Sequence, residues 1–202
     1  MELIQWADMA SWTAISTPKH AEATMQRIAI IGSAGTGKYT LTRRLRELTG
    51  LSVIHLDALY WCPGWVATPD ADWETLVEGI ASQEKWITDG NYGRTMEPRL
   101  ERADTVVFLE FPRVVCLWRV FKRWLRFRGR SKPDMAPGCP ENLYWEFVRW
   151  IWNYPTRSRP RVMERIKGHS ADTEIIVFRS QKEIVRFLAR LADKGDGSTG
   201  SP

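Results

Sequence analysis

The sequence has little of what marks disulfide-rich, zinc-binding or redox proteins. Its 202 residues include three cysteines, and Cys62, Cys116 and Cys139 are widely separated along the chain. They form neither a CxxC pair nor a zinc-ligand spacing with the three histidines. This pattern argues against a disulfide framework and a zinc finger, and we expect a reducing, cytoplasmic compartment.

Long hydrophobic runs are also lacking, and so is a secretory signal. No apolar stretch approaches the roughly 20 residues that a membrane-spanning helix needs. The first 24 residues lack a basic segment followed by an apolar one. We therefore expect no membrane span, and a flexible extension over 1–25, with Met25 as an alternative start. The polar, glycine-rich end over 193–202 is expected to be disordered.

The remaining residues, 26–192, are long enough to form one domain. With 44% hydrophobic residues, the chain can bury a good core. The formal net charge of +5 favours anionic partners, but nucleotides, nucleic acid and acidic membrane surfaces all qualify. Charge alone therefore does not choose between a small-molecule and a nucleic-acid partner, and the oligomeric state is left open.

A glycine-rich run has the Gly-x-x-x-x-Gly-Lys spacing of a phosphate-binding loop. Backbone N–H groups of such a loop surround a polyphosphate, and Lys38 is expected to reach the terminal phosphates. A hydroxyl normally follows this lysine and ligates Mg²⁺, but the position holds Tyr39. The residues expected to bind the nucleotide are Gly32, Ser33, Ala34, Gly35, Thr36, Gly37, Lys38, Tyr39 and Thr40.

The surroundings of this run favour a phosphate loop over an ordinary glycine-rich turn. Residues 27–31 form a β-branched apolar stretch that is typical of a buried strand and ends at the first glycine. After the loop, Leu41, Leu45 and Leu48 recur at helical spacing, and Gly50 is a plausible stop. Strand, loop and helix in this order are the context that the motif requires.

Further strand-like runs separated by helical segments predict a doubly wound parallel sheet. One helix is expected to begin with Thr68 as its cap and Pro69 in its first position, and the last helix is expected over 182–191. No internal repeat is evident. The further strand runs are 51–56, 85–88, 105–109 and 173–178.

Three carboxylates follow strand runs, where ligands bind in open α/β sheets. Asp57, Asp89 and Glu110 each come directly after such a run. Each is also explained by a polar turn that simply begins there. Their convergence on the side of the phosphate loop nevertheless suits phosphoryl transfer, which needs carboxylates around Mg²⁺ and a group that positions the acceptor.

The stretch 89–94, Asp-Gly-Asn-Tyr-Gly-Arg, resembles the strand-Asp-Gly-aromatic-x-Arg signature of adenylate kinases. Together with 55–61 and 133–141, it also resembles the adenylate-kinase-like DNA topology modulation protein family. The resemblance covers most of the core. It implies a three-layer α/β P-loop kinase fold, with a parallel five-stranded sheet, a helical arginine-rich lid, and ATP and Mg²⁺ as cofactors.

The resemblance also implies roles for individual residues. Asp89 matches the aspartate that organises Mg²⁺ and its waters, and Arg94 lies near the arginine that grips an acceptor phosphate. Asp57 stands where related small-molecule kinases bind an acceptor hydroxyl, although a turn acid would look the same. Arg179 follows the last strand, where a loop passes the adenine. The family's proline before the arginine is Gly93 here, which leaves the acceptor open.

The segment Arg113–Arg130 combines an apolar stripe with a row of arginines. The stripe consists of Val114, Leu117, Trp118, Phe121 and Leu125. The row recurs at i, i+4, i+7 and i+11 and suits a lid over 119–142, in which Arg123 and Arg126 stabilise the transferring phosphoryl group. A solvated face, a DNA-binding surface and a membrane-binding surface are the alternatives. The row is Arg119, Arg123, Arg126 and Arg130.

The next helical segment, 143–154, is rich in aromatic residues. Leu143, Phe147, Trp150, Ile151 and Tyr154 would share a face, for which core packing is the simpler interpretation. The other tryptophans, at positions 145 and 152, would cover the arginine helix, a base ring or a partner chain.

Two functions follow from these patterns. The first is an ATP-dependent phosphotransferase acting on a small acceptor, with Lys38, Asp89, Arg123 and Arg126 as catalytic residues. The alternative is a nucleotide-binding module with weak or no transfer that engages DNA through its basic surface. A GTPase is disfavoured because the guanine-reading Asn-Lys-x-Asp run is missing. Because adenylate kinases hold Mg²⁺ mainly through water, Tyr39 predicts weakened Mg²⁺ affinity with ATP binding retained.

Overall fold

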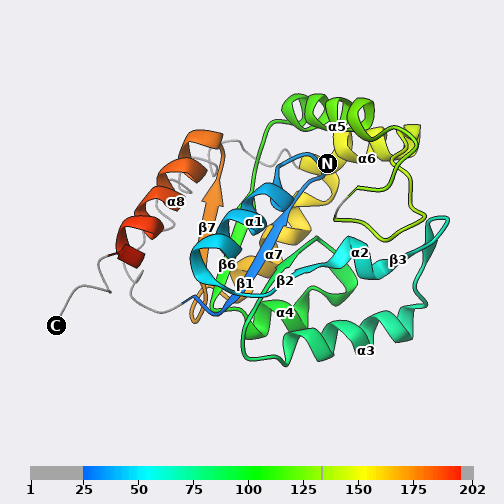
Figure 1. Ribbon diagram of the computed structural model, residues 1–202. Helices are drawn as coiled ribbons and strands as arrows, with labels where there is room; N and C mark the ends of the chain where they lie inside the picture. The colour runs from blue at the N-terminus through cyan, green and yellow to red at the C-terminus, as the bar shows by residue number, and fades with distance from the viewer. Residues whose placement is uncertain (1–24, 133, 197–202) are drawn as a thin grey trace, which may run out of the picture.

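Five parallel strands form the sheet on which the rest of the protein is built (Figure 1). The computed structural model describes residues 25–132 and 134–196. The sheet confirms the predicted five-stranded parallel architecture. In spatial order its strands are β2 (Val53–His55), β5 (Trp86–Asp89), β1 (Arg27–Gly32), β6 (Thr105–Leu109) and β7 (Glu174–Phe178).

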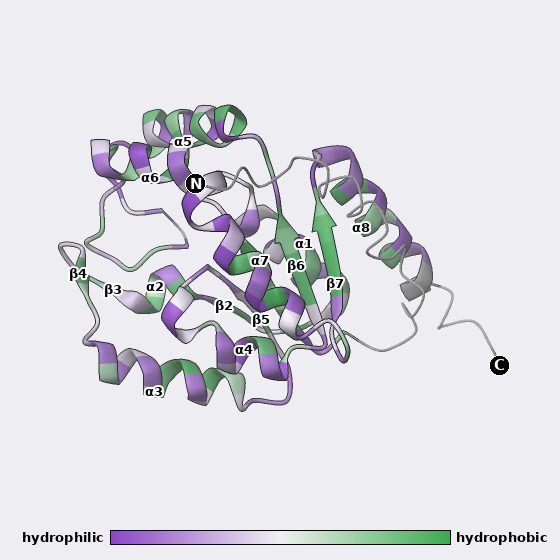
Figure 2. Ribbon diagram, turned by 180° about the vertical axis from the view of Figure 1, so that it is seen from behind, coloured by the Kyte–Doolittle hydropathy of each residue, from purple (hydrophilic) through white to green (hydrophobic). Residues whose placement is uncertain are grey.

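Helices cover both faces of the sheet. On one face, α4 and α7 pack against the sheet through residues such as Leu100 and Ile166, and on the other α1 and α8 do so through Leu45 and Phe187. The strands are mostly apolar because helices cover both faces of the sheet, and Figure 2 shows this most clearly for β6 and β7. The helices are α1 (Lys38–Thr49), α2 (Leu56–Tyr60), α3 (Asp70–Ala81), α4 (Glu97–Arg102), α5 (Arg113–Phe127), α6 (Trp145–Arg157), α7 (Arg159–Gly168) and α8 (Gln181–Asp196).

Smaller elements complete the fold near the ends of the strands. A two-stranded antiparallel hairpin, β3 (Trp61–Cys62) and β4 (Val66–Ala67), lies between α2 and α3. A 3-10 turn, η2 (Gly93–Thr95), follows β5. No helix within the described residues has the length and apolar character needed to cross a membrane.

Several predicted boundaries differ from the structure. The second strand is shorter than 51–56, and Leu56 begins α2, so Asp57 lies in the first turn of a short helix. Thr68 does not cap α3, because its hydroxyl donates to the Tyr60 carbonyl oxygen at 2.8 Å. Pro69 therefore takes the N-cap position and α3 begins at residue 70. The prediction that Gly50 ends the helix after the loop is confirmed by its left-handed C-cap.

The predictions for the two ends of the chain can be compared with the structure only in part. The predicted N-terminal extension lies outside the described residues, except for Met25, which packs partly buried against the core. At the other end, α8 continues to Asp196, beyond the predicted helix end at 191. Residues 197–202 also lie outside the part that the structure describes.

The apolar stripe predicted along α5 is largely exposed in the structure. Val114, Trp118 and Leu125 are each more than half exposed. The buried side of α5 instead carries Cys116 and Val120, which pack with Ile151 of α6, beside α5 in Figure 1. Leu117 is the member of the predicted stripe that packs partly buried against this cluster.

In α6 the predicted aromatic face is partly confirmed. Ile151 and Tyr154 are buried, whereas Trp150 is 39% exposed. The ring of Trp152 lies 4.0 Å from the Arg113 guanidinium carbon, a cation-π contact between α6 and α5. One of the alternatives for the second tryptophan set, cover for the arginine helix, is therefore observed at this residue.

Candidate functional site

The phosphate loop connects β1 to α1 at the carboxyl edge of the sheet. Gly35 has a φ of +78°, and a Cβ there would lie 2.3 Å from the carbonyl oxygen of Cys116 in α5. The loop therefore needs glycine at this position both for its turn and for the close approach of α5. The hydroxyl of Thr36 donates to the Ser33 carbonyl oxygen at 2.8 Å and tightens the turn.

Lys38, the first residue of α1, folds back over the loop. Its Nζ donates to the carbonyl oxygens of Gly32 and Ser33, each at 3.0 Å. Burial lowers the pKa of Lys38 below its usual 10.5, while the charges of Asp57 and Asp89 oppose that shift. The ammonium group is therefore poorly solvated, which favours exchange of the two carbonyl oxygens for charged phosphate oxygens.

The turn after β5 is hydrogen-bonded to the start of the phosphate loop. The side-chain oxygen of Asn91 accepts a hydrogen bond from Gly32 N at 3.0 Å. Arg99, fully buried, donates to the carbonyl oxygens of Gly90 at 3.2 Å and Asn91 at 2.8 Å. Burial lowers the pKa of Arg99 to about 10. This arginine therefore holds the turn that follows Asp89 and, through Asn91, the start of the phosphate loop.

Asp89 is the last residue of β5 and is buried at the strand end. Both of its carboxylate oxygens lie 3.1 Å from Nδ1 of His55, its partner on β2. Burial alone would lower the pKa of His55, because it disfavours the charged ring. The hydrogen bond to Asp89 and the charge of Asp89 have the larger combined effect, so the pKa of His55 lies above its usual 6.5. The ring of Tyr39 lies beside His55, with the centroids 5.3 Å apart.

These residues limit how Mg²⁺ would be held. Among the described residues, no group of three or more His, Cys, Asp and Glu side chains converges to bind a metal ion. Tyr39 replaces the usual hydroxyl ligand and is directed toward His55. The site therefore fits Mg²⁺ coordinated by phosphate oxygens and water, with Asp89 accepting hydrogen bonds from those waters.

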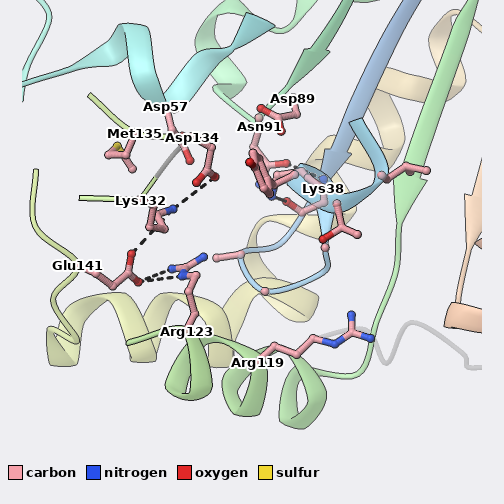
Figure 3. A pocket seen from close by; sticks show the side chains of 18 of the residues that line it. Lys38, Asp57, Asp89, Asn91, Arg119, Arg123, Lys132, Asp134, Met135 and Glu141 are labelled. Atoms are coloured by element: carbon pink, nitrogen blue, oxygen red, sulfur yellow. Dashed lines mark hydrogen bonds and ion pairs between the residues drawn. The ribbon is translucent and has the colours of Figure 1, made fainter. Parts of the chain in front are cut away.

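One pocket of about 1280 Å³ joins the phosphate loop to the carboxylates (Figure 3). Asp57, on α2, accepts a hydrogen bond of 2.6 Å from the Tyr92 hydroxyl, and its charge acts on the ammonium group of Lys38. Burial, followed by the charge of Asp57, raises the pKa of Tyr92 well above its usual 10.0, so the phenol is neutral. Residues from the loop, α1, α2, β5, α5, α6 and α8 all line this one space.

Most of the predicted site residues meet in this pocket. Its walls include Asp57, Asp89, Arg123 and Arg126. Ser33 and Thr36 are buried within the loop instead and do not line the pocket. The members of the predicted nucleotide set that do are Gly32, Ala34, Gly35, Gly37, Lys38, Tyr39 and Thr40.

The predicted arginine row divides into three kinds of position. Arg119 donates to the Thr36 carbonyl oxygen at 3.1 Å and so touches the loop directly. Arg123 binds Glu141, with both contacts under 3 Å, and Arg126 lines the pocket. Arg130 lies beyond the end of α5 and is not part of the helix, which corrects the predicted four-member row.

Three predicted residues are directed elsewhere. Arg94 is exposed and pairs with Asp70 and with Glu74 at 2.8 Å, so the carboxylates of α3 hold it outside the pocket. Glu110 is bound by arginines on both of its oxygens, one of them Arg179 at 3.0 Å. Neither Glu110 nor Arg179 is among the pocket residues. The structure therefore does not bring these three side chains to the candidate site.

Sequence reasoning missed the hairpin and the segment after residue 134 as parts of the pocket wall. Trp61 and Trp65 from the β3–β4 hairpin line the pocket, together with Lys132, Asp134 and Glu141. The hairpin is bound to the segment after residue 134 by three hydrogen bonds: Gly64 N to the Gly138 carbonyl oxygen at 2.9 Å, Trp65 Nε1 to that of Pro140 at 3.1 Å, and Cys139 Sγ to that of Cys62 at 3.1 Å. The chain therefore covers this part of the pocket from two sides.

Comparison with known proteins supports the fold. No protein-family model matches the chain, and no curated protein matches its sequence. A shikimate kinase from Acinetobacter baumannii, solved in complex with shikimate, is 17% identical over 91% of this chain and 100% of that chain, with a TM-score of 0.52. A gluconokinase from Sinorhizobium meliloti 1021 is 19% identical over 88% of this chain and 99% of that chain, with a TM-score of 0.47.

These likenesses differ in what they show. At 17% identity, the likeness to the shikimate kinase concerns the fold alone. The gluconokinase, with its lower TM-score, adds nothing to that conclusion. Membership of the DNA topology modulation protein family stays a prediction from sequence. The chain has the P-loop kinase fold, with its phosphate loop at the carboxyl edge of the sheet.

Proposed function

We propose that the protein is an ATP-dependent phosphotransferase that transfers the γ-phosphoryl group to a small acceptor. The observation that carries the proposal is the single pocket that joins Lys38 to Asp57. At about 1280 Å³ it offers room for a nucleotide and a small acceptor together. Phosphoryl transfer depends mainly on positioning the two reactants and stabilising charge, and one continuous space permits both.

The loop end would hold ATP. Backbone N–H groups of the loop and the ammonium group of Lys38 would bind the β- and γ-phosphates. Asp89 would hold Mg²⁺ through water, and the metal would neutralise part of the phosphate charge. Arg126 lines the pocket and forms no ion pair with a carboxylate of the described residues, so it is the arginine best placed to respond to charge developing on the phosphoryl group.

The Asp57 end would hold the acceptor. A hydroxyl that donates to the Asp57 carboxylate would have its oxygen oriented toward the γ-phosphorus, while Tyr92 fixes the carboxylate from the other side. A bond forms between this oxygen and the phosphorus as the bond to the ADP oxygen breaks, and the hydroxyl proton passes to Asp57. The predicted roles of Lys38, Asp89 and Asp57 are thus compatible with one pocket.

An acceptor screen that measures ADP release tests this function. We expect at least one small hydroxyl compound to stimulate ADP release by the wild type, and Lys38→Ala to lose that stimulation. Lys122→Ala is the matched control, because Lys122 lies on the exposed side of α5 and not in the pocket. Stimulation that survives Lys38→Ala would contradict the proposal.

The same screen separates the alternative function. A nucleotide-binding module that engages DNA would bind ATP without acceptor-stimulated turnover and would bind DNA with a steep dependence on salt. That combination would favour the module and contradict the phosphotransferase.

A further inference from the structure

We propose that the acceptor is a small hydroxyl compound without a phosphate or carboxylate group, uncharged or cationic, and that Glu141 excludes anionic acceptors. This inference rests on the phosphotransferase function proposed above and specifies its acceptor. It follows from the pairing of charges on the side of the pocket that carries Asp134 and Glu141 (Figure 3).

The cations on this side are already bound to carboxylates. Arg123 donates to Oε1 of Glu141 through Nε at 2.9 Å and Nη2 at 2.7 Å. Lys132 Nζ lies 3.9 Å from Glu141 and 3.6 Å from Asp134. Figure 3 shows these four side chains as one connected group beside the pocket. Two cations therefore face two carboxylates, and the charges of the group balance.

Burial makes this group hard to open. Glu141 is 3% exposed and Lys132 is 8% exposed. An acceptor phosphate or carboxylate would have to draw Arg123 or Lys132 away from Glu141, leaving a buried carboxylate without its partner. Breaking a buried pair in this way costs about a hundredfold or more in affinity. An acceptor with no negative charge avoids that cost.

The remaining charge on this side is negative. Asp89 is paired with His55, whereas the hydrogen bond to Asp57 comes from the neutral phenol of Tyr92. Arg94, the arginine predicted to grip an acceptor phosphate, is held outside by α3. Within the described residues, Asp57 is in no ion pair, although its charge acts on the ammonium group of Lys38. It favours a hydroxyl or a cation and repels an anion.

The side walls suit the same class of compound. Trp61 and Trp65 line the pocket with their ring centroids 5.5 Å apart. Met135 adds a further apolar side chain to the lining. Aromatic rings attract cations and pack against the carbon atoms of polyols, but they offer nothing to a phosphate.

Binding of a matched pair of probes tests the inference. Glucosamine and glucosamine 6-phosphate differ by one phosphate group. The full-length protein, loaded with a non-hydrolysable ATP analogue, would be titrated with each while the indole N–H signals of Trp61 and Trp65 are followed by NMR. We expect the wild type to bind glucosamine at least about tenfold more tightly than its phosphate ester. In Glu141→Gln, which removes the carboxylate bound to Arg123 and leaves Lys132 with Asp134 as its ion-pair partner, we expect this preference to shrink or reverse.

The results that overturn the inference are distinct from those that overturn the proposed function. Equal or tighter binding of glucosamine 6-phosphate by the wild type overturns the inference, as does failure of glucosamine to perturb either indole. Both results are read from the wild type, so they stand even if Glu141→Gln does not fold. Binding of the ATP analogue, compared in wild type and Lys38→Ala beforehand, tests the phosphotransferase function separately.

Discussion

Tyr39 is the residue whose chemistry bears most directly on the metal. Its ring lies beside His55, and the hydroxyl that usually ligates Mg²⁺ is missing from this position. We expect Tyr39→Ser to reach half-maximal ATP binding at a several-fold lower Mg²⁺ concentration than the wild type. Calorimetric titration of Mg²⁺ at fixed ATP measures this. Tyr39→Phe, which keeps the ring, should behave as the wild type, and equal metal dependence in all three proteins would refute the idea.

Gly35 is the residue through which α5 contacts the phosphate loop. Because a Cβ would meet the Cys116 carbonyl oxygen, we expect Gly35→Ala to lower the free energy of unfolding by about 1–3 kcal/mol and to weaken ATP binding. Gly129→Ala is the matched control, since Gly129 also has a positive φ but has no atom within 4 Å of a Cβ. Urea denaturation and ATP titration measure both effects. Equal losses in the two variants would show that the contact with α5 is unimportant.

Individual site residues were predictable from the sequence where they belong to a recognisable local motif. Lys38 belongs to the glycine-loop motif and Asp89 ends a strand run, so both positions follow from local sequence pattern. His55 and Asn91 were missed because their partners are set by tertiary structure. His55 meets Asp89 only through the register of β2 against β5, and Asn91 meets Gly32 across 59 residues.

Among the helices, α8 has a capping arrangement at its start that gives a pH-dependent prediction. Ser180 Oγ lies 3.3 Å from Glu183 N and donates to Glu183 Oε1, while Glu183 Oε2 accepts from Arg179 N at 2.8 Å. Partial burial acts against the charge, but these hydrogen bonds prevail and hold the pKa of Glu183 below its usual 4.5. The ionised carboxylate therefore stabilises α8 above pH 4.5, and this contribution is lost as the pH falls through the lowered pKa.

We accordingly expect Glu183→Gln to lower the free energy of unfolding at pH 7 by about 0.5–1 kcal/mol, a small value because the group is largely exposed. The difference from the wild type should shrink as the pH falls below 4.5. Glu164→Gln on the exposed side of α7 is the control for loss of a surface carboxylate. Urea denaturation from pH 3 to 7 measures this. A difference that is constant with pH would contradict the role of the charge.

Elements were predicted well where burial governs them and poorly where it does not. The core strands are long apolar runs, so β1 and β6 were found within a residue. The hairpin β3–β4 has two residues per strand and a turn with positive φ at Gly64 and Trp65, too short a pattern to read. The exposure of the α5 stripe was not predictable, because hydrophobic periodicity identifies an apolar face without showing whether another element covers it.

For the whole molecule, the sequence predicted the edge at which the site forms. Strands of one direction place their following loops together, so the phosphate loop, α2 and the turn after β5 share one side of the sheet. The cover over the acceptor end was not predictable, because it depends on contacts between the hairpin and residues around Gly138, more than 70 positions apart. The proposed class of acceptor therefore rests on tertiary contacts, namely the hairpin wall and the ion pairs of Glu141.

The central claim is that one pocket transfers phosphoryl groups from ATP at Lys38 to an acceptor at Asp57. The most direct measurement follows the label from γ-³²P-ATP, incubated with an acceptor from the ADP-release screen. We predict that the label appears in the acceptor with the wild type and falls by at least about a hundredfold with Lys38→Ala and with Asp57→Asn. Release of the label as inorganic phosphate alone, or undiminished transfer by Asp57→Asn, would contradict the account.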